Sequence, residues 1–223
     1  MPERPLINFE GGRVALGPLR RELLPRHQAW INDFSALRTL GVVAPRPTTF
    51  EQETDWCDRA QQSDAIRFTI YERATWEPIG NTGLNASDAR DRTAVFGILI
   101  GEPAARGKGY GTEATRLVLD DAFHGLGLHS VMLTCAEFNW AGRRAYANAG
   151  FREFGRRRQC RWLADRLWDD ISMDCLADEF ASLGLAALFA PDPTRPPDDA
   201  AKSASDAARI GDRRSWRESR SAR

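Results

Sequence analysis

Hydrophobic and polar positions change their spacing several times along the chain, and each change predicts a new element. Apolar residues three and four positions apart indicate an amphipathic helix, whereas strict alternation is typical of a strand with one buried face. The helical pattern covers residues 20–34, with Pro25 in the first turns, and residues 48–62. In the second helix, Thr48 as the cap and Glu51 three residues later fit a capping box.

Short alternating or fully apolar stretches predict strands between and after these helices. We expect two more helices, from about residue 111 to 125 and from residue 139 to 150, each closed by glycine. Because antiparallel neighbours are mixed with crossover connections, the order of elements predicts an α+β fold around one sheet. The expected strands cover residues 13–19, 66–73, 78–87, 93–101 and 129–136, with two more in 151–176 about a turn near 164–166.

The composition of the chain changes near residue 190. From Pro191 onward, prolines and small and charged residues dominate, and Ile210 and Trp216 are the only large apolar side chains. Such a segment cannot bury enough apolar surface to offset the entropy lost on ordering. We therefore predict a single domain over residues 1–185 and a disordered tail over residues 186–223.

Overall charge excludes some classes of function. Basic and acidic residues number 31 each, so no net field attracts nucleic acid or an anionic membrane. The N-terminal residues lack the apolar core of a signal peptide, and no apolar run approaches the roughly 20 residues of a membrane span. The four cysteines form no CxxC pair and the chain has no His cluster, so we expect reduced cysteines and no metal site. These features predict a cytoplasmic protein.

The stretch RGKGYGTEA, residues 106–114, places three glycines directly before a helix. The first amides of a helix are unpaired and carry partial positive charge, so anions and above all phosphates bind there. Glycine lets the backbone approach a ligand closely and adopt positive φ. The Walker pattern fails because no Gly-Lys pair precedes Ser or Thr, and the dinucleotide pattern fails because its third glycine would fall at Thr112. A glycine-rich turn without a ligand remains the alternative.

Two motifs resemble the GCN5-related N-acetyltransferase (GNAT) superfamily. Residues 106–111 read Arg-x-x-Gly-x-Gly, like the pyrophosphate loop of that family. Residues 139–151, NWAGRRAYANAGF, resemble its closing element, with Gly142 standing where the family has alanine. The resemblance covers about residues 7–180 and is nearest to the branch of ribosomal-protein alanine N-acetyltransferases. It implies one twisted, mostly antiparallel sheet of six to seven strands, splayed in the middle and flanked by four to five helices.

The resemblance also implies acetyl-CoA as cosubstrate, no metal, and direct attack of an amine on the thioester. It assigns Tyr146 as the general acid that protonates the leaving thiolate, and Asn139 as a contact of the thioester arm. The strand residues assigned to the pantetheine are Ile98, Leu99 and Ile100. The residues assigned to the pyrophosphate are Arg106, Gly107, Lys108, Gly109, Tyr110, Gly111 and Thr112.

The general base and the acceptor stay open. Candidates for the base are Glu102 and Glu137, and Asn85 and Ser87 are alternatives that would position a water. The acceptor pocket is expected to include Trp30, Asp33, Phe34 and Arg38, although helix packing explains the aromatic pair equally well. The acceptor is a protein N-terminal α-amine or a small amine such as a polyamine, an antibiotic or an amino acid. A non-catalytic acyl-CoA-binding module and a homodimer also remain open.

Overall fold

A computed structural model describes residues 4–40 and 46–191 of the chain. The chain divides into a first unit, Met1–Leu188, and a second unit, Phe189–Arg223. Nearly all of the second unit lies outside the described residues. The predicted disorder of the tail therefore stays a prediction, and the fold described below is that of the first unit.

One eight-stranded sheet forms the centre of this unit, in the order β1-β2-β3-β4-β5-β6-β8-β7. All neighbours are antiparallel except β5 and β6, which are parallel. The α+β class is confirmed, and the strand count exceeds the expected six to seven because β1 is too short to give a pattern. The strands are β1 Phe9–Glu10, β2 Val14–Pro18, β3 Ile66–Glu72, β4 Pro78–Asp88, β5 Thr93–Ile100, β6 Ser130–Ala136, β7 Arg152–Leu163 and β8 Arg166–Leu176.

The single helix expected over residues 20–34 is wrong, because the segment divides into three short helical pieces. Pro25 has no amide hydrogen, so it fits the first turn of α1 and no later position. Asp33 then starts α2 as its cap, accepting a hydrogen bond from the Ser35 amide. The helical elements are η1 Arg21–Leu23, α1 Leu24–Ile31, α2 Phe34–Leu37, α3 Phe50–Gln62, η2 Pro103–Ala105, α4 Tyr110–Asp120 with a π-turn at Asp121–Gly125, α5 Trp140–Ala149, η4 Ala177–Glu179 and α6 Leu185–Leu188.

The capping box of α3 lies one residue later than predicted, on Thr49 and Gln52. Thr48 cannot serve as the cap because its backbone is tied to the end of α1. Its amide donates to Asn32 Oδ1 at 2.9 Å, and its carbonyl accepts from Asn32 Nδ2 at 2.9 Å and from Gln28. A contact with a distant segment thus decides between two adjacent threonines.

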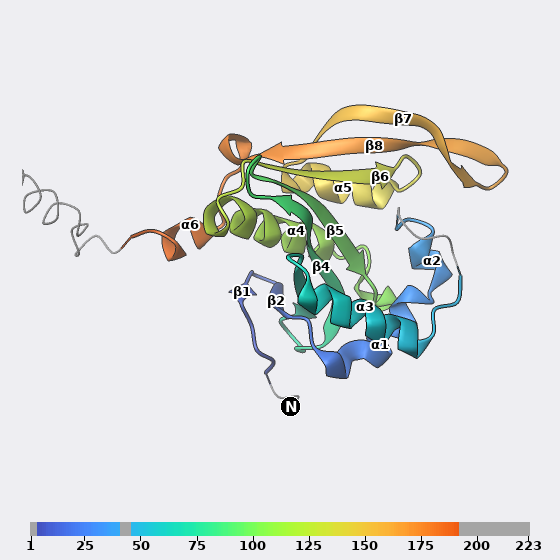
Figure 1. Ribbon diagram of the computed structural model, residues 1–223, viewed down its shortest axis with the longest axis horizontal. Helices are drawn as coiled ribbons and strands as arrows, with labels where there is room; N and C mark the ends of the chain where they lie inside the picture. Colours follow the sequence, from blue (N-terminus) through green and yellow to red (C-terminus); the bar gives the residue numbers. More distant parts are fainter. Residues whose placement is uncertain (1–3, 41–45, 192–223) are drawn as a thin grey trace, which may run out of the picture. The chain divides into compact units, whose positions relative to one another are not determined.

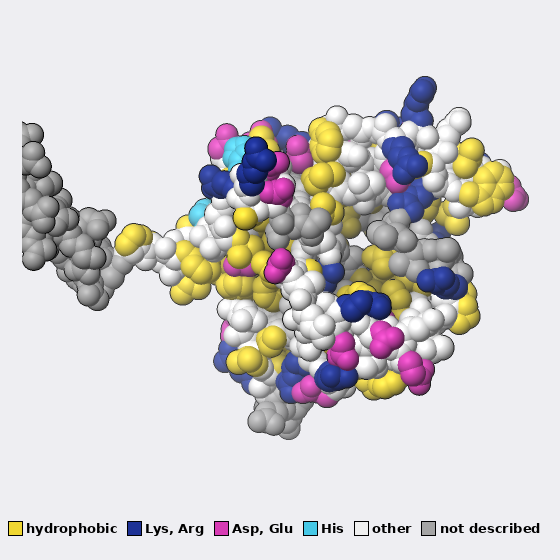
Figure 2. All heavy atoms as spheres, in the orientation of Figure 1, with side chains coloured by type: hydrophobic (Ala, Val, Ile, Leu, Met, Phe, Trp, Pro, Cys, Tyr) yellow, Lys and Arg dark blue, Asp and Glu magenta, His cyan; other side chains and the backbone are white. Residues whose placement is uncertain are grey.

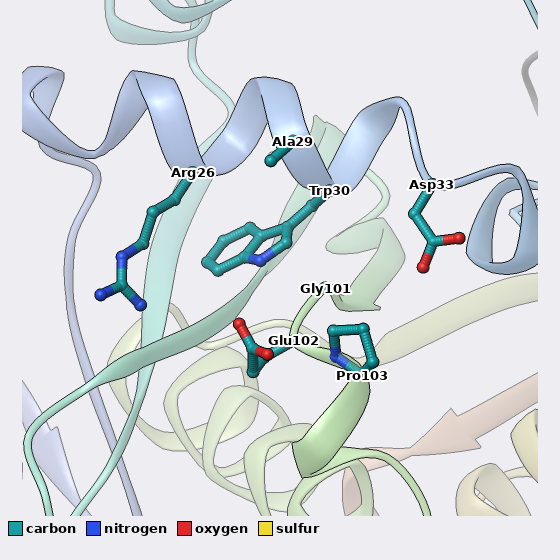
Figure 3. A pocket seen from close by; sticks show the side chains of 7 residues that line it. All are labelled: Arg26, Ala29, Trp30, Asp33, Gly101, Glu102 and Pro103. Carbon is teal, nitrogen blue, oxygen red and sulfur yellow. The ribbon is translucent and has the colours of Figure 1, made fainter.

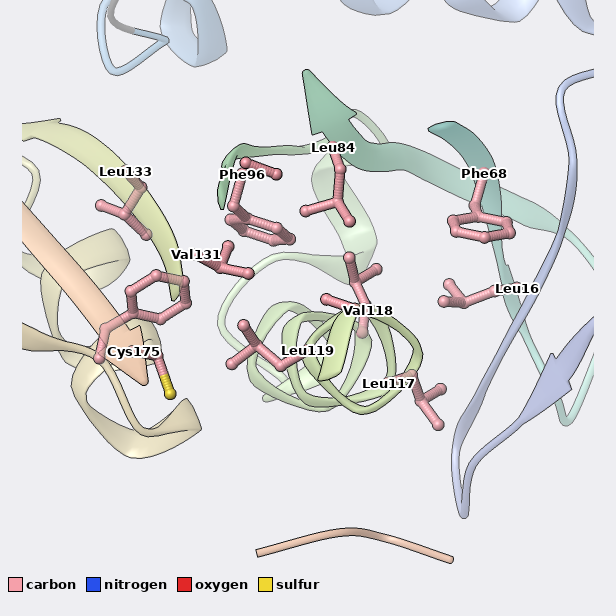
Figure 4. Close-up of a cluster of buried hydrophobic side chains, with 14 of the residues drawn as sticks. Leu16, Phe68, Leu84, Phe96, Leu117, Val118, Leu119, Val131, Leu133 and Cys175 are labelled. Carbon is pink, nitrogen blue, oxygen red and sulfur yellow. The ribbon is translucent and has the colours of Figure 1, made fainter. Parts of the chain in front are cut away.

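Helix α4 covers one face of the sheet. Figure 4 shows Leu117, Val118 and Leu119 of this helix below side chains that come from several strands. Leu16, Ile70 and Val131 are among the strand residues of this cluster, and all three are fully buried. Burial of a side chain of this size stabilises the fold by about 1.5–3 kcal/mol. The core therefore fixes α4, and with it the position of the loop that precedes it.

The opposite face carries α1 and α3, which pack on each other (Figure 1). Alternation along β3 separates the two faces, since Phe68 and Ile70 join the α4 cluster while Arg67 lies against α3. The guanidinium of Arg67 lies 5.9 Å from the centre of the Trp56 ring. On the face seen in Figure 2, basic and acidic side chains are intermingled, as the balanced charge of the chain leads one to expect.

Strands β5 and β6 separate after a short stretch of pairing. Their parallel register covers Thr93 with Ser130 through Val95 with Met132, and both strands continue beyond it. Over the described residues, the rest of β5 pairs only with β4, from Phe96 to Ile100. This is the splayed pair that the family resemblance implies, and no other strand pairs with this part of β5 on the side facing β6.

A buried acid at the end of α4 gives a pH prediction. Burial and the neighbouring Asp120 raise the pKa of Asp121 from 3.8 to about 6. Because folding raises this pKa, the contribution of Asp121 to the free energy of unfolding is fully present below the pKa of the unfolded chain. It is lost as the pH rises through the folded-state pKa of about 6. We therefore expect Asp121→Asn to raise the free energy of unfolding at pH 7 by about 2 kcal/mol. Urea unfolding at pH 7 and pH 3 checks this, because the gain should vanish at pH 3, below the unfolded-state pKa of 3.8.

Candidate active site

The glycine loop lies between the end of β5 and the start of α4. The short helix η2 leads into it, and Gly109 is the N-cap residue of α4. Gly107 and Gly109 adopt φ of 75° and 81°, in the left-handed region that favours glycine. These angles turn the chain sharply twice before the helix begins. Of the three glycines that the sequence places before the helix, Gly107 and Gly109 thus have the backbone conformation that requires glycine, whereas Gly111 lies in the first turn of α4 without positive φ.

The backbone amides of residues 107 to 112 have no hydrogen-bond partner among the residues that the structure describes. The amide of Arg106 differs, because it donates to the Pro103 carbonyl at 3.2 Å. The first turn of α4 adds the positive end of the helix dipole to the same place. The loop is therefore equipped to hold an anion with its backbone.

Residues that are distant in the sequence hold the glycine loop in place through hydrogen bonds. Arg13 Nη1 donates to the Lys108 carbonyl at 2.9 Å, and Arg13 Nε donates to Glu113 Oε2 at 3.1 Å. The Tyr110 hydroxyl donates to Glu72 on β3. Sequence reasoning missed Arg13, Glu113 and Glu72 in this role. No local signal could have found them, since the first pair is separated by 100 positions.

Arg106 turns its side chain away from the free amides. Its Nε donates to the Ile100 carbonyl at 3.0 Å and its Nη2 to the Gly101 carbonyl at 2.6 Å. Nη2 also lies 2.7 Å from Asp33 Oδ2. Hydrogen bonds from Ser35 and then from Arg106 lower the pKa of Asp33 to about 2, so this carboxylate is charged at neutral pH. Arg106 thus fastens the end of β5 to the start of α2.

Lys108 keeps its charge available. No carboxylate lies within salt-bridge distance of it among the described residues, and its side chain is exposed. Because Arg106 is engaged elsewhere, Lys108 is the loop cation that can approach a bound anion. In this structure the Arg106 side chain contacts the protein itself, and the expectation that both cations serve the phosphates stays a prediction.

Tyr146 lies half-buried on α5, against Phe96 of β5 and against Phe151. The centre of the Tyr146 ring lies 6.2 Å from that of Phe96 and 6.1 Å from that of Phe151, in edge-to-face geometry in both cases. Burial, and to a lesser extent Cys135, raise the pKa of the phenol above its ordinary value of 10.0. No hydrogen bond within the described ranges occupies its hydroxyl. The phenol is therefore protonated at neutral pH and free to donate.

Asn139 caps α5 through its side chain. Its Oδ1 accepts from the Gly142 amide at 3.0 Å. An added Cβ at Gly142 would lie 2.5 Å from Asn139 Nδ2, so the glycine leaves room for this cap. In this conformation the side-chain oxygen of Asn139 is occupied by the first turn of α5.

The loop and α5 lie next to each other. The Thr112 hydroxyl donates to the Ala145 carbonyl at 3.4 Å, one residue before Tyr146. Tyr146 in turn contacts Phe96, where β5 has parted from β6. The free amides, the separated strands and the free phenol are therefore parts of one region.

A cavity of about 330 Å³ lies beside the end of β5. Figure 3 shows the Trp30 indole and the Glu102 carboxylate facing the same space, with Arg26 and Asp33 on either side. Glu102 forms no ion pair or side-chain hydrogen bond with any residue of the described chain. Arg26 pairs instead with Glu77 at 2.6 Å. Of the predicted acceptor residues, Trp30 and Asp33 are thus brought together with Glu102.

Other predicted residues lie elsewhere. Phe34 and Arg38 are exposed and do not line this cavity. Asn85 accepts a hydrogen bond from Arg67. Glu137 lies 3.3 Å from Arg156 and also accepts from the Asp169 amide, so it serves the β7–β8 hairpin. Of Ser87 the structure describes only the strand backbone.

The comparison with protein families identifies the class. The model of the acetyltransferase (GNAT) domain matches residues 13–152, which include both the loop and Tyr146. The chain therefore belongs to the GNAT acetyltransferase family. Its place in the branch of ribosomal-protein alanine N-acetyltransferases is not established by this match.

Curated relatives match over part of their length. The chain is 30% identical to alpha/beta-tubulin-N-acetyltransferase 9 of Homo sapiens over 131 residues, which are 53% of this chain and 62% of the relative. It is 32% identical to the probable N-acetyltransferase YjcK of Bacillus subtilis over 103 residues, 46% of this chain and 56% of the relative. The chain thus spans less than two thirds of either protein.

Solved structures share the fold. The spermidine N-acetyltransferase of Vibrio cholerae, solved with CoA and spermine, superposes with a TM-score of 0.69 at 23% identity, covering 76% of this chain and 99% of that one. A GNAT acetyltransferase of Bacillus anthracis gives 0.66 at 18% identity, covering 78% and 100%. At such identities the likeness concerns the fold alone.

Within residues 4–40 and 46–191, no three His, Cys, Asp or Glu side chains gather as metal ligands do. No helix in the described part combines the length and hydropathy that a membrane span requires. All four cysteines are free, three of them buried and Cys160 half-buried.

Proposed function

We propose that the protein is an acetyl-CoA-dependent N-acetyltransferase that transfers the acetyl group directly to a primary amine. The observation that carries this proposal is the row of unpartnered amides at residues 107 to 112, in a chain of the GNAT family. A protein that folds in water leaves few consecutive amides unpaired unless solvent or a ligand satisfies them. Their place at the start of an 11-residue helix favours an anionic ligand.

The residues present fit acetyl-CoA. The amides of residues 107 to 112 and the Lys108 ammonium would hold the diphosphate. The edge of β5 at Ile98, Leu99 and Ile100, which no other strand covers, would hold the amide-containing pantetheine arm as a neighbouring strand would, although the Ile100 carbonyl already accepts a hydrogen bond from Arg106. Asn139, capping α5, lies at the end of β6 on the other side of the gap. Acetyl-CoA supplies the activated acetyl group, and the protein supplies binding and proton transfer.

Tyr146 is the proton donor in this proposal. The amine nitrogen forms a bond to the thioester carbonyl carbon, the C–S bond breaks, and the leaving sulfur takes the phenol proton. Burial keeps that proton on Tyr146 at neutral pH, and its hydroxyl has no competing acceptor among the described side chains. A backbone N–H of the unpaired part of β5 would stabilise the charge that develops on the carbonyl oxygen.

The base is proposed to be Glu102, acting directly or through water. It is the carboxylate without a partner in the cavity lined by Trp30 and Asp33. A carboxylate and an indole face together suit a cationic amine, which the cavity would receive before it loses a proton. An α-amine needs less help than a lysine-like amine, because its pKa is about 8 and not about 10.

Two acceptor classes follow from different observations. The proposed likeness to the ribosomal-protein branch favours a protein N-terminal α-amine, and one relative is named for tubulin. The fold neighbour solved with spermine and the carboxylate in the cavity favour a small polyamine. We favour the protein N-terminus as the acceptor. The argument for it rests on motifs in this chain's own sequence, whereas the argument for a polyamine rests partly on the ligand of another protein.

A thiol-release assay tests the function and separates the acceptors. Purified protein and acetyl-CoA would be mixed with peptides beginning with Ala, Ser or Met, with spermidine, and with an aminoglycoside. We expect CoA release above the hydrolytic background with at least one peptide. CoA release with spermidine but with no peptide would show that the acceptor is a small amine and not a protein N-terminus. Cofactor binding without release by any amine would favour a non-catalytic acyl-CoA-binding module.

A further inference from the structure

We propose that Arg13 sets the direction in which the Gly109 amide points, and that it is a positioning residue for the diphosphate of acetyl-CoA. The inference rests on the proposed function. Arg13 directly precedes β2, and its Nη1 donates to the Lys108 carbonyl at 2.9 Å. It touches the loop through the protein's own carbonyl, on the peptide that joins Lys108 to Gly109.

Peptide geometry converts this contact into an orientation. The described chain contains no cis peptide bond, so the Lys108 carbonyl and the Gly109 N–H point in opposite directions. When Arg13 holds the carbonyl, the N–H must point away from Arg13. Lys108 lies between two glycines with positive φ, and glycine offers little steric resistance to rotation of an adjacent peptide plane. Without Arg13, this peptide could turn its carbonyl toward a bound anion.

Arg13 is itself held firmly. Its own amide donates to Glu113 Oε1 at 2.8 Å, and its Nε donates to Oε2 at 3.1 Å. The guanidinium carbon lies 5.8 Å from the centre of the Tyr110 ring. Burial alone would raise the pKa of Glu113, but the hydrogen bonds from Arg13 lower it below 4.5, so the carboxylate is charged at neutral pH. β2 and the first turn of α4 thus fix both ends of the contact.

The position of Gly109 agrees with this role. An added Cβ at this residue would lie 3.0 Å from Arg13 Nη2. The guanidinium therefore lies directly against the side of Gly109 that a side chain would occupy. The other side, toward which the N–H points, is left for the ligand.

Arg13→Gln tests the inference, with Arg21→Gln as matched control, because Arg21 forms an exposed ion pair with Asp58 far from the loop. We expect Arg13→Gln to raise KM for acetyl-CoA about tenfold, or about 1.4 kcal/mol. kcat should stay within about twofold. The second-order rate constant for S-acetylpantetheine, which lacks the diphosphate, should not change.

Two results would overturn the inference. One is an unchanged KM for acetyl-CoA in Arg13→Gln. The other is an equal loss with acetyl-CoA and S-acetylpantetheine, which would reveal a general structural role. Failure of the proposed function looks different, because the wild-type protein would then neither bind nor use acetyl-CoA.

Discussion

Tyr146→Phe is expected to lower kcat by at least about 100-fold, while the affinity for CoA stays within about twofold. A positioned general acid contributes about 10²- to 10⁴-fold, and phenylalanine keeps the ring while removing the proton. The contacts with Phe96 and Phe151 depend on the ring and should persist. Steady-state kinetics and calorimetric titration with CoA measure the two quantities separately.

Tyr71→Phe is the matched control for this experiment. Tyr71 on β3 is buried, and its hydroxyl also lacks a partner among the described residues. The substitution is chemically the same but lies outside the proposed site, so kcat should not change. An unchanged kcat in Tyr146→Phe would contradict the assignment, and loss of CoA binding with an unfolded spectrum would show that Tyr146 acts through packing.

The wild-type pH profile provides a second check on Tyr146. Because burial raises its pKa above 10.0, the phenol stays protonated throughout the neutral and mildly alkaline range. The rate should therefore rise with pH as the acceptor amine loses its proton. At pH values up to about 10 the rate should not decrease again. A descending limb near pH 8 would indicate a different acid.

Gly109→Val is expected to raise KM for acetyl-CoA by about 100-fold. At φ of 81° a β-branched residue is strained by roughly 1–3 kcal/mol, and its Cβ would meet the guanidinium of Arg13 at 3.0 Å. The loop can relieve the strain only by rotating peptides whose amides are proposed to face the diphosphate. Initial rates over a range of acetyl-CoA concentrations give KM directly.

Gly184→Val controls for the strain itself. Gly184 also has positive φ, of 123°, and an added Cβ there would meet nothing within 4 Å. The control should lower the melting temperature without changing KM for acetyl-CoA. If both variants raise KM equally, the effect comes from loss of stability and the loop has no special role.

Sequence could predict the parts of the site that are local. Gly107 and Gly109 lie directly before a helix, and their positive φ follows from turn chemistry that a few residues decide. Tyr146 lies on α5 and Asn139 is the N-cap of the same helix, seven residues earlier. Their motif is therefore continuous in the sequence and can be recognised without the structure. The single, mostly antiparallel sheet and the separation of β5 from β6 followed from the family resemblance and are confirmed.

Sequence could not predict the parts that depend on tertiary contacts. Thr48 and Thr49 are equally good caps until the Asn32 side chain binds the first of them. Arg106 was expected on the phosphate, but the carbonyls at the end of β5 and the charge of Asp33 bind it first. Arg13 and Glu113 meet across 100 positions, and nothing in either segment marks them as partners.

A crystal structure of the complex with CoA tests the central claim most directly. We predict diphosphate oxygens within about 2.7–3.2 Å of several backbone nitrogens of residues 107 to 112, with the thiol end directed toward Tyr146. The Lys108 carbonyl should remain on Arg13. A diphosphate bound elsewhere on the protein, with these amides turned away from it, would contradict the account.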